Sequence, residues 1–396
     1  MTDPESQIDT QLARLGRDPQ LHRGTVNVPV YRASTILFDS VGALADARAH
    51  RYDPSFVYYG TYGTPTVHAL EEAIAALEGG YAAVAVSSGL AACTSSILAF
   101  VQQGDHILVT DSVYEPTRSF CDGVLARMGV ATSYYDPRIG AGIAGLMQPN
   151  TKLVFTESPG SQTFEIQDIP AICAAVHARG ALVLMDNTWA TPLFFRALDA
   201  GVDVAIHAAT KYVAGHSDAV TGLIVTTETC YMPVRKLTTL LGQYVSPDEA
   251  YLVLRGLRTM SIRLRHQQAS ALALARWLET QPEMLRVLHP ALPSHPDHAL
   301  WQRDFRGAAG LFAFVMQPAA PAAVAAFLDG LRFFALGFSW GGFESLILHV
   351  KPAHARTATD WDESSGELIR LNVGLEDPID LQADLEAGFA RLRAHG

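Results

Sequence analysis

The chain has 396 residues, of which 49% are hydrophobic and 17% charged, and this is enough for a large core and about two domains. A net charge of −11 without any basic cluster argues against nucleic acid and anionic membranes as partners. Four scattered cysteines are too few for a disulfide framework or a zinc site, and the polar N-terminus lacks the order of a signal peptide. We therefore expect a protein of the reducing cytoplasm.

Residues 1–61 show no clear sheet or helix period beyond one possible helix, yet they carry several aromatic side chains. We expect this arm to pack on a neighbouring subunit. A turn at 59–65 precedes an amphipathic helix that is predicted over 66–78. Residues 79–101 carry no charge, but their polar and small interior excludes a membrane span and favours a strand, a turn and a helix.

Short apolar runs then recur along the chain, and most are separated by segments of helical length that end in glycine. The runs cover residues 82–86, 106–109, 152–156, 181–185, 203–207 and 222–226. This alternation predicts a mostly parallel sheet with helices on both faces. The active site is then expected along the carboxyl edge of the sheet.

The pattern changes near residue 256, within a long helix predicted over 251–279. Further strands are expected at 310–316, 345–350 and 368–373, with a closing helix from Asp380. These elements indicate a smaller α+β domain. The expected organisation is thus an arm (1–61), a large α/β domain (62–257) and a C-terminal α+β domain (258–396).

Lys211 lies on a loop directly after the apolar run 203–207, and Gly215 with Ser217 predicts a tight turn behind it. At the carboxyl end of a strand a lysine can form a Schiff base with an aldehyde cofactor. A solvated lysine in a connecting loop is the alternative, and it is the commoner case for a lysine considered alone.

Other candidate side chains are expected near the same edge. The amides of Gly89 and Leu90 open a helix and can face an anion, although a tight turn also explains the glycine. Asp186 can pair with a pyridinium nitrogen or merely cap the next helix. Tyr114 can stack on a planar cofactor and exchange a proton, or be an ordinary core aromatic. Arg370, on an apolar strand, is either part of an internal ion pair or a clamp for a substrate carboxylate.

A set of longer motifs extends over most of the chain. They are YGTYGTPT at 59–66, QGDH at 103–106, YEP at 114–116, ESPGS at 157–161, MDNTW at 185–189, ATKYVAGHSD at 209–218, RGLRT at 255–259, FSWGGFES at 338–345 and IR at 369–370. Taken together, they resemble the pyridoxal-phosphate enzymes of cysteine and methionine metabolism. The resemblance implies an aspartate-aminotransferase-like type I fold, pyridoxal phosphate as cofactor, an amino-acid substrate and a homotetramer whose sites borrow from adjacent chains.

The resemblance also implies a role for each matching residue. Lys211 matches the lysine that binds the cofactor, Asp186 the partner of the pyridine nitrogen, and Tyr114 the stacked ring. The phosphate cradle is matched by Gly89, Leu90 and Thr210, with Tyr59 reaching the phosphate and the substrate of a neighbouring subunit. The group that holds the substrate carboxylate is matched by Ser339, Trp340 and Arg370.

Two positions depart from the family pattern. Thr61 stands where an arginine is common, and Ala208 and Ala209 stand where a serine is frequent. Both changes remove phosphate ligands, and one charge-assisted hydrogen bond is worth roughly 1.5–3 kcal/mol. Arg51 or Tyr62 can compensate, and the sequence leaves this choice open.

Within the family the pattern is most similar to members that act as carbon–sulfur lyases on cystathionine, by a β-elimination of transsulfuration in methionine biosynthesis. In such a reaction Lys211 takes the Cα proton, Lys211 or Tyr114 protonates the leaving thiolate, and homocysteine, pyruvate and ammonia result. Residues 159–161 read Pro-Gly-Ser where members with γ-chemistry usually carry an asparagine, and those members lack the Ser-Trp-Gly-Gly at 339–342.

Several alternatives remain open at this point. The first is a lyase for cysteine S-conjugates or a cysteine desulfhydrase, and the second is a γ-lyase or γ-replacement transferase of the same family. An aminotransferase is possible on fold alone, but its motifs are not these. A non-catalytic binding protein is expected to have lost Lys211, Asp186 or Arg370, and all three remain. No metal site is expected, because none of the 14 histidines, His349 and His354 included, has ligand spacing with cysteine or carboxylate partners.

Overall fold

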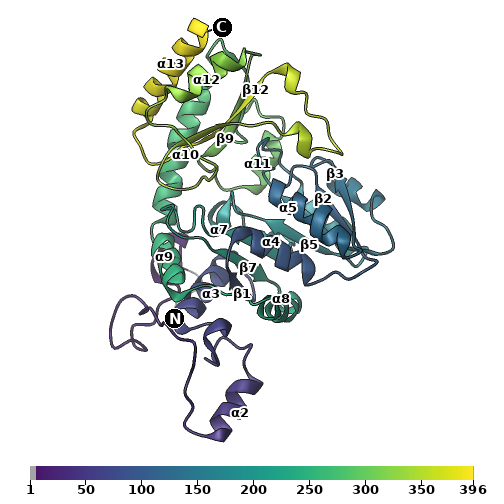
Figure 1. Ribbon diagram of the computed structural model, residues 1–396, viewed down its shortest axis with the longest axis vertical. Coiled ribbons are helices and arrows are strands. Elements are labelled where there is room, and N and C mark those ends of the chain that lie inside the picture. Colours follow the sequence, from purple (N-terminus) through teal and green to yellow (C-terminus); the bar gives the residue numbers. More distant parts are fainter. Residues whose placement is uncertain (1–5, 396) are drawn as a thin grey trace.

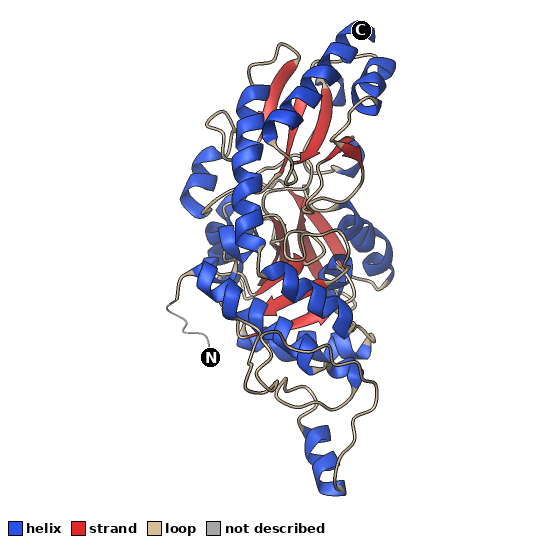
Figure 2. Cartoon of the chain, turned by 90° about the vertical axis from the view of Figure 1, so that its left-hand side faces the viewer, coloured by secondary structure: helices blue, strands red, loops and turns tan. Residues whose placement is uncertain are grey.

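The computed structural model describes residues 6–395, and its strands form two sheets (Figures 1 and 2). The larger sheet has seven strands in the order β1-β7-β6-β5-β4-β2-β3, and β7 runs antiparallel to both of its neighbours while the strands from β6 to β3 are parallel. Its strands are β1 (Ala82–Val86), β2 (His106–Thr110), β3 (Ala131–Tyr135), β4 (Thr151–Glu157), β5 (Leu182–Asp186), β6 (Val204–Ala208) and β7 (Gly222–Thr226). The predicted mostly parallel sheet is confirmed.

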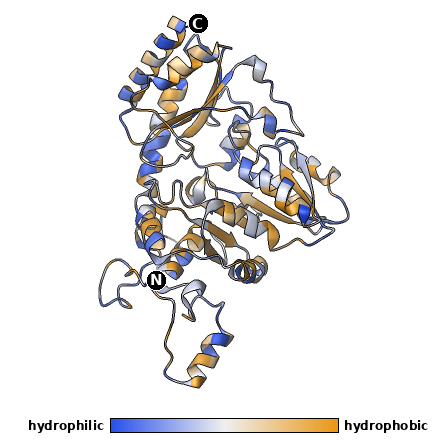
Figure 3. Ribbon diagram, in the orientation of Figure 1, coloured by the Kyte–Doolittle hydropathy of each residue, from blue (hydrophilic) through white to orange (hydrophobic). Residues whose placement is uncertain are grey.

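Helices cover both faces of the larger sheet, because alternate residues of each strand point to opposite sides. Ala83 and Ala85 face the side packed by α3 (Pro65–Glu78), α6 (Ile169–His177) and α9 (Pro247–Leu257). Val84 and Val86 face the side covered by α4 (Gly89–Leu98), α5 (Glu115–Phe120) and α8 (Glu228–Leu240). The interior of the larger sheet is accordingly hydrophobic, and Figure 3 colours much of it orange.

The smaller sheet has the order β10-β11-β12-β9-β8 and is antiparallel except for the pair β10 and β11. Its strands are β8 (Met284–Leu288), β9 (Leu311–Met316), β10 (Ala335–Leu336), β11 (Leu346–His349) and β12 (Glu367–Asn372). It packs against α10 (Met260–Leu278), α12 (Pro321–Asp329) and α13 (Pro378–His395), with stacked Phe327 and Phe389 rings in their core. This smaller α+β unit agrees with the predicted fold class, whereas the exact domain boundaries stay a prediction.

The single long helix predicted over 251–279 is wrong, because α9 ends at Leu257 and α10 begins at Met260. Thr259 leaves the helical conformation, with φ −110° and ψ 5°. The guanidinium of Arg263 donates to the carbonyl oxygen of Gly256 at 2.9 Å, which satisfies a group exposed by the break. Gly256 itself packs so closely on the lysine loop that a Cβ there would lie 2.1 Å from the Ala214 carbonyl oxygen.

Short elements complete the fold. They are α1 (Ile8–Arg14), α2 (Val41–Ala49), α7 (Thr191–Phe194), α11 (His298–Asp304), the 3₁₀ turns η1 (Gly60–Tyr62), η3 (Gly140–Gly145), η4 (Leu198–Ala200), η5 (Ala353–Ala355) and η6 (Glu363–Ser365), and the π-helical turn η2 (Cys121–Leu125). Within residues 6–395, no helix has the length and hydropathy needed to cross a membrane.

The N-terminal arm extends away from the body of the molecule, and α2 lies at its far end (Figure 1). Apolar side chains of the arm are strongly exposed in the single chain: Leu37 is 90% exposed, Val41 85% and Leu21 76%. Exposed apolar surface of this kind marks an interaction site. That the arm packs on a second subunit stays a prediction.

Candidate active site

The carboxyl ends of four neighbouring strands, β6, β5, β4 and β2, meet at one edge of the larger sheet, where the predicted residues lie. Asp186 ends β5, and the loop that holds Lys211 follows β6. Tyr114 lies between β2 and α5. Glu157 ends β4 directly beside Asp186 in the sheet register. The turn at 338–344 and strand β12 approach this edge from the smaller sheet.

Lys211 is partly buried, whereas the other three lysines, Lys152, Lys236 and Lys351, are exposed. Its Nζ donates a hydrogen bond to Ser339 Oγ at 2.8 Å and lies 5.0 Å from the centre of the Trp340 ring. Burial, and then the nearby charge of Arg370, lower the pKa of Lys211 to about 8. A neutral amine is therefore accessible near neutral pH, as a nucleophile or base requires.

The loop around Lys211 is held by close backbone contacts. The predicted turn is present, with Gly215 at φ +68° and Ser217 at φ +56°. Gly341, at φ +82°, approaches so closely that a Cβ there would lie 3.1 Å from the Cβ of Lys211. The Tyr212 ring lies 5.4 Å from that of Trp340, and together these contacts fix the lysine against the 338–344 turn.

Asp186 is a carboxylate that forms no ion pair or hydrogen bond with a basic side chain among the described residues. Its Oδ1 accepts from the Thr188 amide at 3.0 Å, and the Cys93 thiol donates weakly to its Oδ2 at 3.7 Å. Burial raises the pKa of Asp186, because its hydrogen bonds do not fully offset the cost of removing the charged carboxylate from water. A protonated pyridine nitrogen would offset that cost.

Tyr114 has a half-exposed ring, and its backbone amide donates to Glu157 Oε2 at 2.7 Å. Burial raises the pKa of Tyr114, so its phenol stays neutral at physiological pH and can act as a proton donor. Burial and the neighbouring Asp186 charge raise the pKa of Glu157 as well. The sequence does not predict that Glu157 binds the backbone of Tyr114, although Glu157 belongs to the motif ESPGS.

Gly89 opens α4 beside the lysine loop, at a point where a Cβ would lie 2.5 Å from the Cβ of Ala208. Only glycine fits this approach, which brings the start of α4 against Ala208, two residues before Thr210. The Thr210 hydroxyl accepts from the Thr221 amide at 3.1 Å. Leu90, next to Gly89, is partly exposed. The arrangement leaves a helix N-terminus open at the sheet edge, which suits a phosphate.

Arg370 projects from β12 toward the 338–344 turn. Its Nη2 donates to the carbonyl oxygens of Phe338 at 2.9 Å and Ser339 at 3.2 Å. Burial lowers the pKa of Arg370 to about 10, so it remains charged. Two residues further along the same strand, Asn372 accepts from the Gly341 amide at 3.0 Å and donates to the Glu344 carbonyl at 2.9 Å. Asn372 is not among the predicted site residues. Side chains two positions apart on a strand share a face, so the position of Arg370 could have indicated Asn372 as a site residue.

Tyr59 is the one predicted site residue that this chain does not bring to Lys211. It lines a groove of the arm with Tyr58 and Tyr62, and its side chain is 43% exposed. No hydrogen bond or ring contact joins Tyr59 to the lysine loop within the described part of the chain. Arg51, stacked 4.7 Å over the Tyr52 ring, and the exposed Thr61 belong to the same region.

These residues match the chemical parts of pyridoxal phosphate. Lys211 offers an amine to an aldehyde, Asp186 is a buried carboxylate without an ion pair, the Tyr114 ring offers a stacking surface, and the first turn of α4 can take a phosphate. The fold and the site therefore define a pyridoxal-phosphate-dependent enzyme of the type I fold.

Comparison with known proteins agrees with this class. Residues 9–390 match the model of the Cys/Met metabolism PLP-dependent enzyme family. A cystathionine β-lyase of Escherichia coli strain K12 is 47% identical, with 98% of this chain and 99% of that protein covered. A cystathionine β-lyase of Salmonella typhimurium strain LT2 is 46% identical, with 99% and 100% covered.

A solved structure is similar as well. The cystathionine γ-synthase of Xanthomonas oryzae pv. oryzae, in complex with aminoacrylate and cysteine, superposes with a TM-score of 0.89 at 34% identity, covering 99% of this chain and 100% of that one. The chain thus belongs to the Cys/Met metabolism family of pyridoxal-phosphate-dependent enzymes, and its cofactor is pyridoxal phosphate.

Proposed function

We propose that this protein is a carbon–sulfur lyase that converts L-cystathionine and water into homocysteine, pyruvate and ammonia by β-elimination. The observation that carries the proposal is the position of the Lys211 amine, 2.8 Å from Ser339 Oγ and beside Trp340, Arg370 and Asp186. The two cystathionine β-lyases at 46% and 47% identity support the choice of substrate and reaction.

We assign the cofactor to residues of the sheet edge. Lys211 would bind its aldehyde, Asp186 would keep its pyridine nitrogen protonated, and Tyr114 would stack on its ring. Gly89, Leu90 and Thr210 would hold its phosphate at the first turn of α4. When bound, pyridoxal phosphate supplies an electron sink for the pair of electrons that remains at Cα after proton loss.

The chain itself supplies binding and proton transfer. Arg370 holds the substrate carboxylate together with Ser339 and Trp340, and this places the Cα proton toward Lys211 Nζ. Lys211, as a neutral amine, accepts that proton. Tyr114, whose pKa is raised by burial, is a proton donor rather than a base, so we assign it or the protonated Lys211 to the leaving thiolate of homocysteine. Hydrolysis of the three-carbon remainder gives pyruvate and ammonia.

The rate of cleavage should rise with pH and then level off above about 8, the pKa to which burial and the Arg370 charge lower Lys211. The amine is free only after the substrate has displaced it from the cofactor, and below that pH it is protonated and cannot accept the Cα proton. The kcat, measured at saturating cystathionine, should therefore fall by about tenfold per pH unit. A pH–rate profile checks this, with recovery of activity after preincubation at each pH as the control. A profile whose rise is centred near the ordinary pKa of lysine would contradict the assignment of Lys211 as the base.

Replacement of Arg370 by alanine should raise the KM for cystathionine about 10- to 100-fold, because a charge-assisted hydrogen bond to the substrate carboxylate is lost. The absorption spectrum of the bound cofactor should change little. Arg370→Lys should restore part of the affinity, since a charge without the planar fork remains. The exposed Arg393 on α13 serves as the control for loss of an arginine. An unchanged KM in Arg370→Ala would argue against the clamp.

A γ-elimination or γ-replacement is the second candidate, because the similar solved structure is that of a γ-synthase. γ-Chemistry requires a further proton removal at Cβ, and the Pro-Gly-Ser at 159–161 stands where an asparagine is usual in γ-members. Initial rates with cystathionine, cysteine and an acylated homoserine distinguish β-elimination from γ-chemistry. Cystathionine should have the highest kcat/KM, and dependence on acylated homoserine would overturn the β-lyase proposal.

The arm supports a further assignment, that the protein forms a homotetramer of the reducing cytoplasm. Exposed apolar side chains of the arm, such as Leu37 and Val41, indicate a surface that another subunit covers. Docking of the arm on a second subunit would bring Tyr59 to the phosphate site of that subunit. All four cysteines are buried and free, which suits a reducing compartment. Light scattering at micromolar concentration checks the assembly, and a monomer would contradict it.

A further inference from the structure

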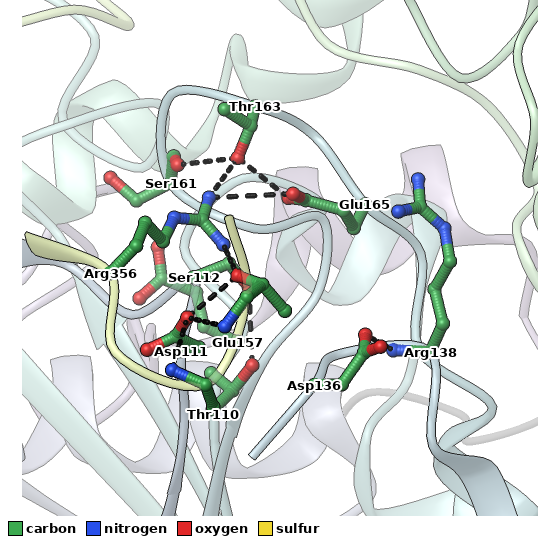
Figure 4. A network of polar contacts seen from close by, with 12 residues as sticks. Thr110, Asp111, Ser112, Asp136, Arg138, Glu157, Ser161, Thr163, Glu165 and Arg356 are labelled. Atoms are coloured by element: carbon green, nitrogen blue, oxygen red, sulfur yellow. Dashed lines mark hydrogen bonds and ion pairs between the residues drawn. The ribbon is translucent and has the colours of Figure 1, made fainter. Parts of the chain in front are cut away.

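Four residues of the loop after β11, Arg356 to Thr359, cross the carboxyl ends of β2 and β4; we call them the latch segment. Figure 4 shows Arg356 of this segment beside Asp111, Glu157, Thr163 and Glu165. The loop comes from the C-terminal part of the chain, whereas its partners belong to the larger sheet. The contact therefore joins the two sheets of the molecule near the proposed site.

Asp111, directly after β2, is the main anchor of the latch segment. Its carboxylate accepts from the amides of Thr357 at 3.0 Å, Ala358 at 3.1 Å and Thr359 at 2.8 Å. The Thr359 hydroxyl donates a further bond at 2.6 Å, and Arg118 forms an ion pair with the same carboxylate. Three successive amides around one carboxylate form a compact anion nest.

The anchor is built as a charged group. The Asp111 side chain has no exposed surface. Burial by itself would raise the pKa of Asp111, but the hydrogen bonds of Thr359 and Thr357 and the charge of Arg118 outweigh it and leave the pKa below its ordinary value. The carboxylate is thus ionised at physiological pH, which strengthens each hydrogen bond to it.

Arg356 gives the latch segment a second attachment. Its guanidinium donates to the Thr163 hydroxyl and lies 3.4 Å from Glu165 Oε1. Thr163 and Glu165 follow β4 and thus Glu157, the residue that accepts the Tyr114 amide. The segment is thereby tied to both strands that hold Tyr114.

Tyr114 lies between the residues that bind the latch. Asp111 precedes it by three positions and Arg118 follows it by four, and the two side chains pair across the turn that bears the ring. The Arg118 guanidinium is further held 3.5 Å from the centre of the Tyr134 ring. Loss of the Asp111 carboxylate would release the latch segment and this turn together.

A cavity of about 1060 Å³ borders the latch segment, and its lining includes residues 358–362, β8 and the attachment residues Arg356, Thr163 and Glu165. Trp361, at the edge of the cavity, contacts Arg286 of β8 at 4.9 Å. Because open space borders the segment, the amides of residues 357–359 rely on the carboxylate of Asp111 as their hydrogen-bond partner.

We propose that Asp111 is a positioning residue, which uses the latch segment to hold the Tyr114 ring in place over the cofactor. The role rests on the proposed function through Tyr114 and deepens it. Asp111 touches neither substrate nor cofactor. It acts by ordering the turn at 111–118, with Arg356 as the second attachment point.

Asp111→Asn in the holoenzyme tests the proposal, because it removes the charge and places amide hydrogens against the amides of the nest. Asp362→Asn is the matched control, since that carboxylate lies in the same loop, is exposed and accepts only locally from Ser364 in the contacts of the described chain. Thr359→Val, which loses one hydroxyl bond to Asp111, and Thr359→Ser, which keeps it, form a milder second pair in case Asp111→Asn folds poorly.

Three readouts separate positioning from general destabilisation. Hydrogen exchange of amides 357–359 should be about tenfold faster in Asp111→Asn, since those hydrogen bonds weaken. The visible circular dichroism of the bound cofactor should shift toward that of Tyr114→Ala. The kcat should fall about tenfold with a smaller change in KM. Thr359→Val should show the same changes to a lesser extent, and Thr359→Ser and Asp362→Asn should resemble the parent protein.

Unchanged exchange at 357–359 in Asp111→Asn and Thr359→Val would overturn the latch. Faster exchange with unchanged dichroism and kcat would overturn the positioning of Tyr114. A parent protein that binds the cofactor but does not cleave cystathionine would contradict the proposed function alone, because exchange and dichroism still decide on the latch.

Discussion

Lys211→Ala is expected to lose cystathionine cleavage by more than about 10⁴-fold and to lose the yellow absorption of the lysine-bound cofactor. The substitution removes the only described lysine that is partly buried at the sheet edge, and with it both the amine that binds the aldehyde and the base for the Cα proton. Steady-state rates and an absorption spectrum of the purified variant measure the two losses.

The variant should remain folded, because Lys211 makes one side-chain hydrogen bond, to Ser339, and relief of a buried amine offsets that loss. An unchanged far-UV circular dichroism spectrum checks the fold. Lys236→Ala, an exposed lysine of α8, is the control and should keep full activity. Borohydride reduction followed by peptide mapping should place the cofactor on Lys211 among the four lysines. Substantial elimination by Lys211→Ala would refute its role.

Asp186→Asn is expected to lower kcat by about 10²–10³-fold, the size of effect seen when one preorganised electrostatic partner is removed. A neutral amide cannot keep a pyridine nitrogen protonated, so the electron sink weakens while the carboxylate clamp at Arg370 is untouched. The KM should therefore change less than kcat. Rates at saturating cystathionine, together with cofactor titration, make the measurement.

The conservative variant Asp186→Glu should recover part of the rate, because it keeps a charge that can reach the same nitrogen. Asp329→Asn, at the exposed end of α12, controls for loss of a carboxylate and should behave as the parent protein. A kcat for Asp186→Asn within about threefold of the parent would show that Asp186 caps the next residues and does not serve the cofactor.

The strands of the sheet interior could be predicted because each is a short apolar run between turn signals. Edge and short strands could not: β3 reads Ala-Thr-Ser-Tyr-Tyr, which contains no apolar run, and is only partly buried, and β10 has two residues. The false prediction of one helix over 251–279 has a similar cause. Apolar periodicity continues through Leu257 and Met260, while the break depends on the distant contact of Gly256 with Ala214.

The residues of the site likewise fall into those that the sequence predicts and those that it does not. Lys211, Asp186 and Tyr114 follow strands of one sheet, so topology alone brings them to one edge. Glu157 ends a strand of that sheet too, and only the Tyr114 amide contact reveals its part in the site. Strand alternation indicates only the position of Asn372. Its partners at 341–344 and those of Asp111 at 357–359 are far away in sequence, and no local pattern predicts these contacts. Tyr59 matches the family motif, but its groove lies on the arm of this chain.

The central claim is that this protein cleaves the β carbon–sulfur bond of cystathionine with the cofactor held by Lys211. The most direct test is to incubate the yellow holoenzyme with L-cystathionine and to quantify the thiol and the keto acid. Homocysteine, pyruvate and ammonia in equal amounts are the predicted result, with no product from Lys211→Ala. Cysteine with 2-ketobutyrate would contradict the β-elimination, although the fold and the cofactor would stand.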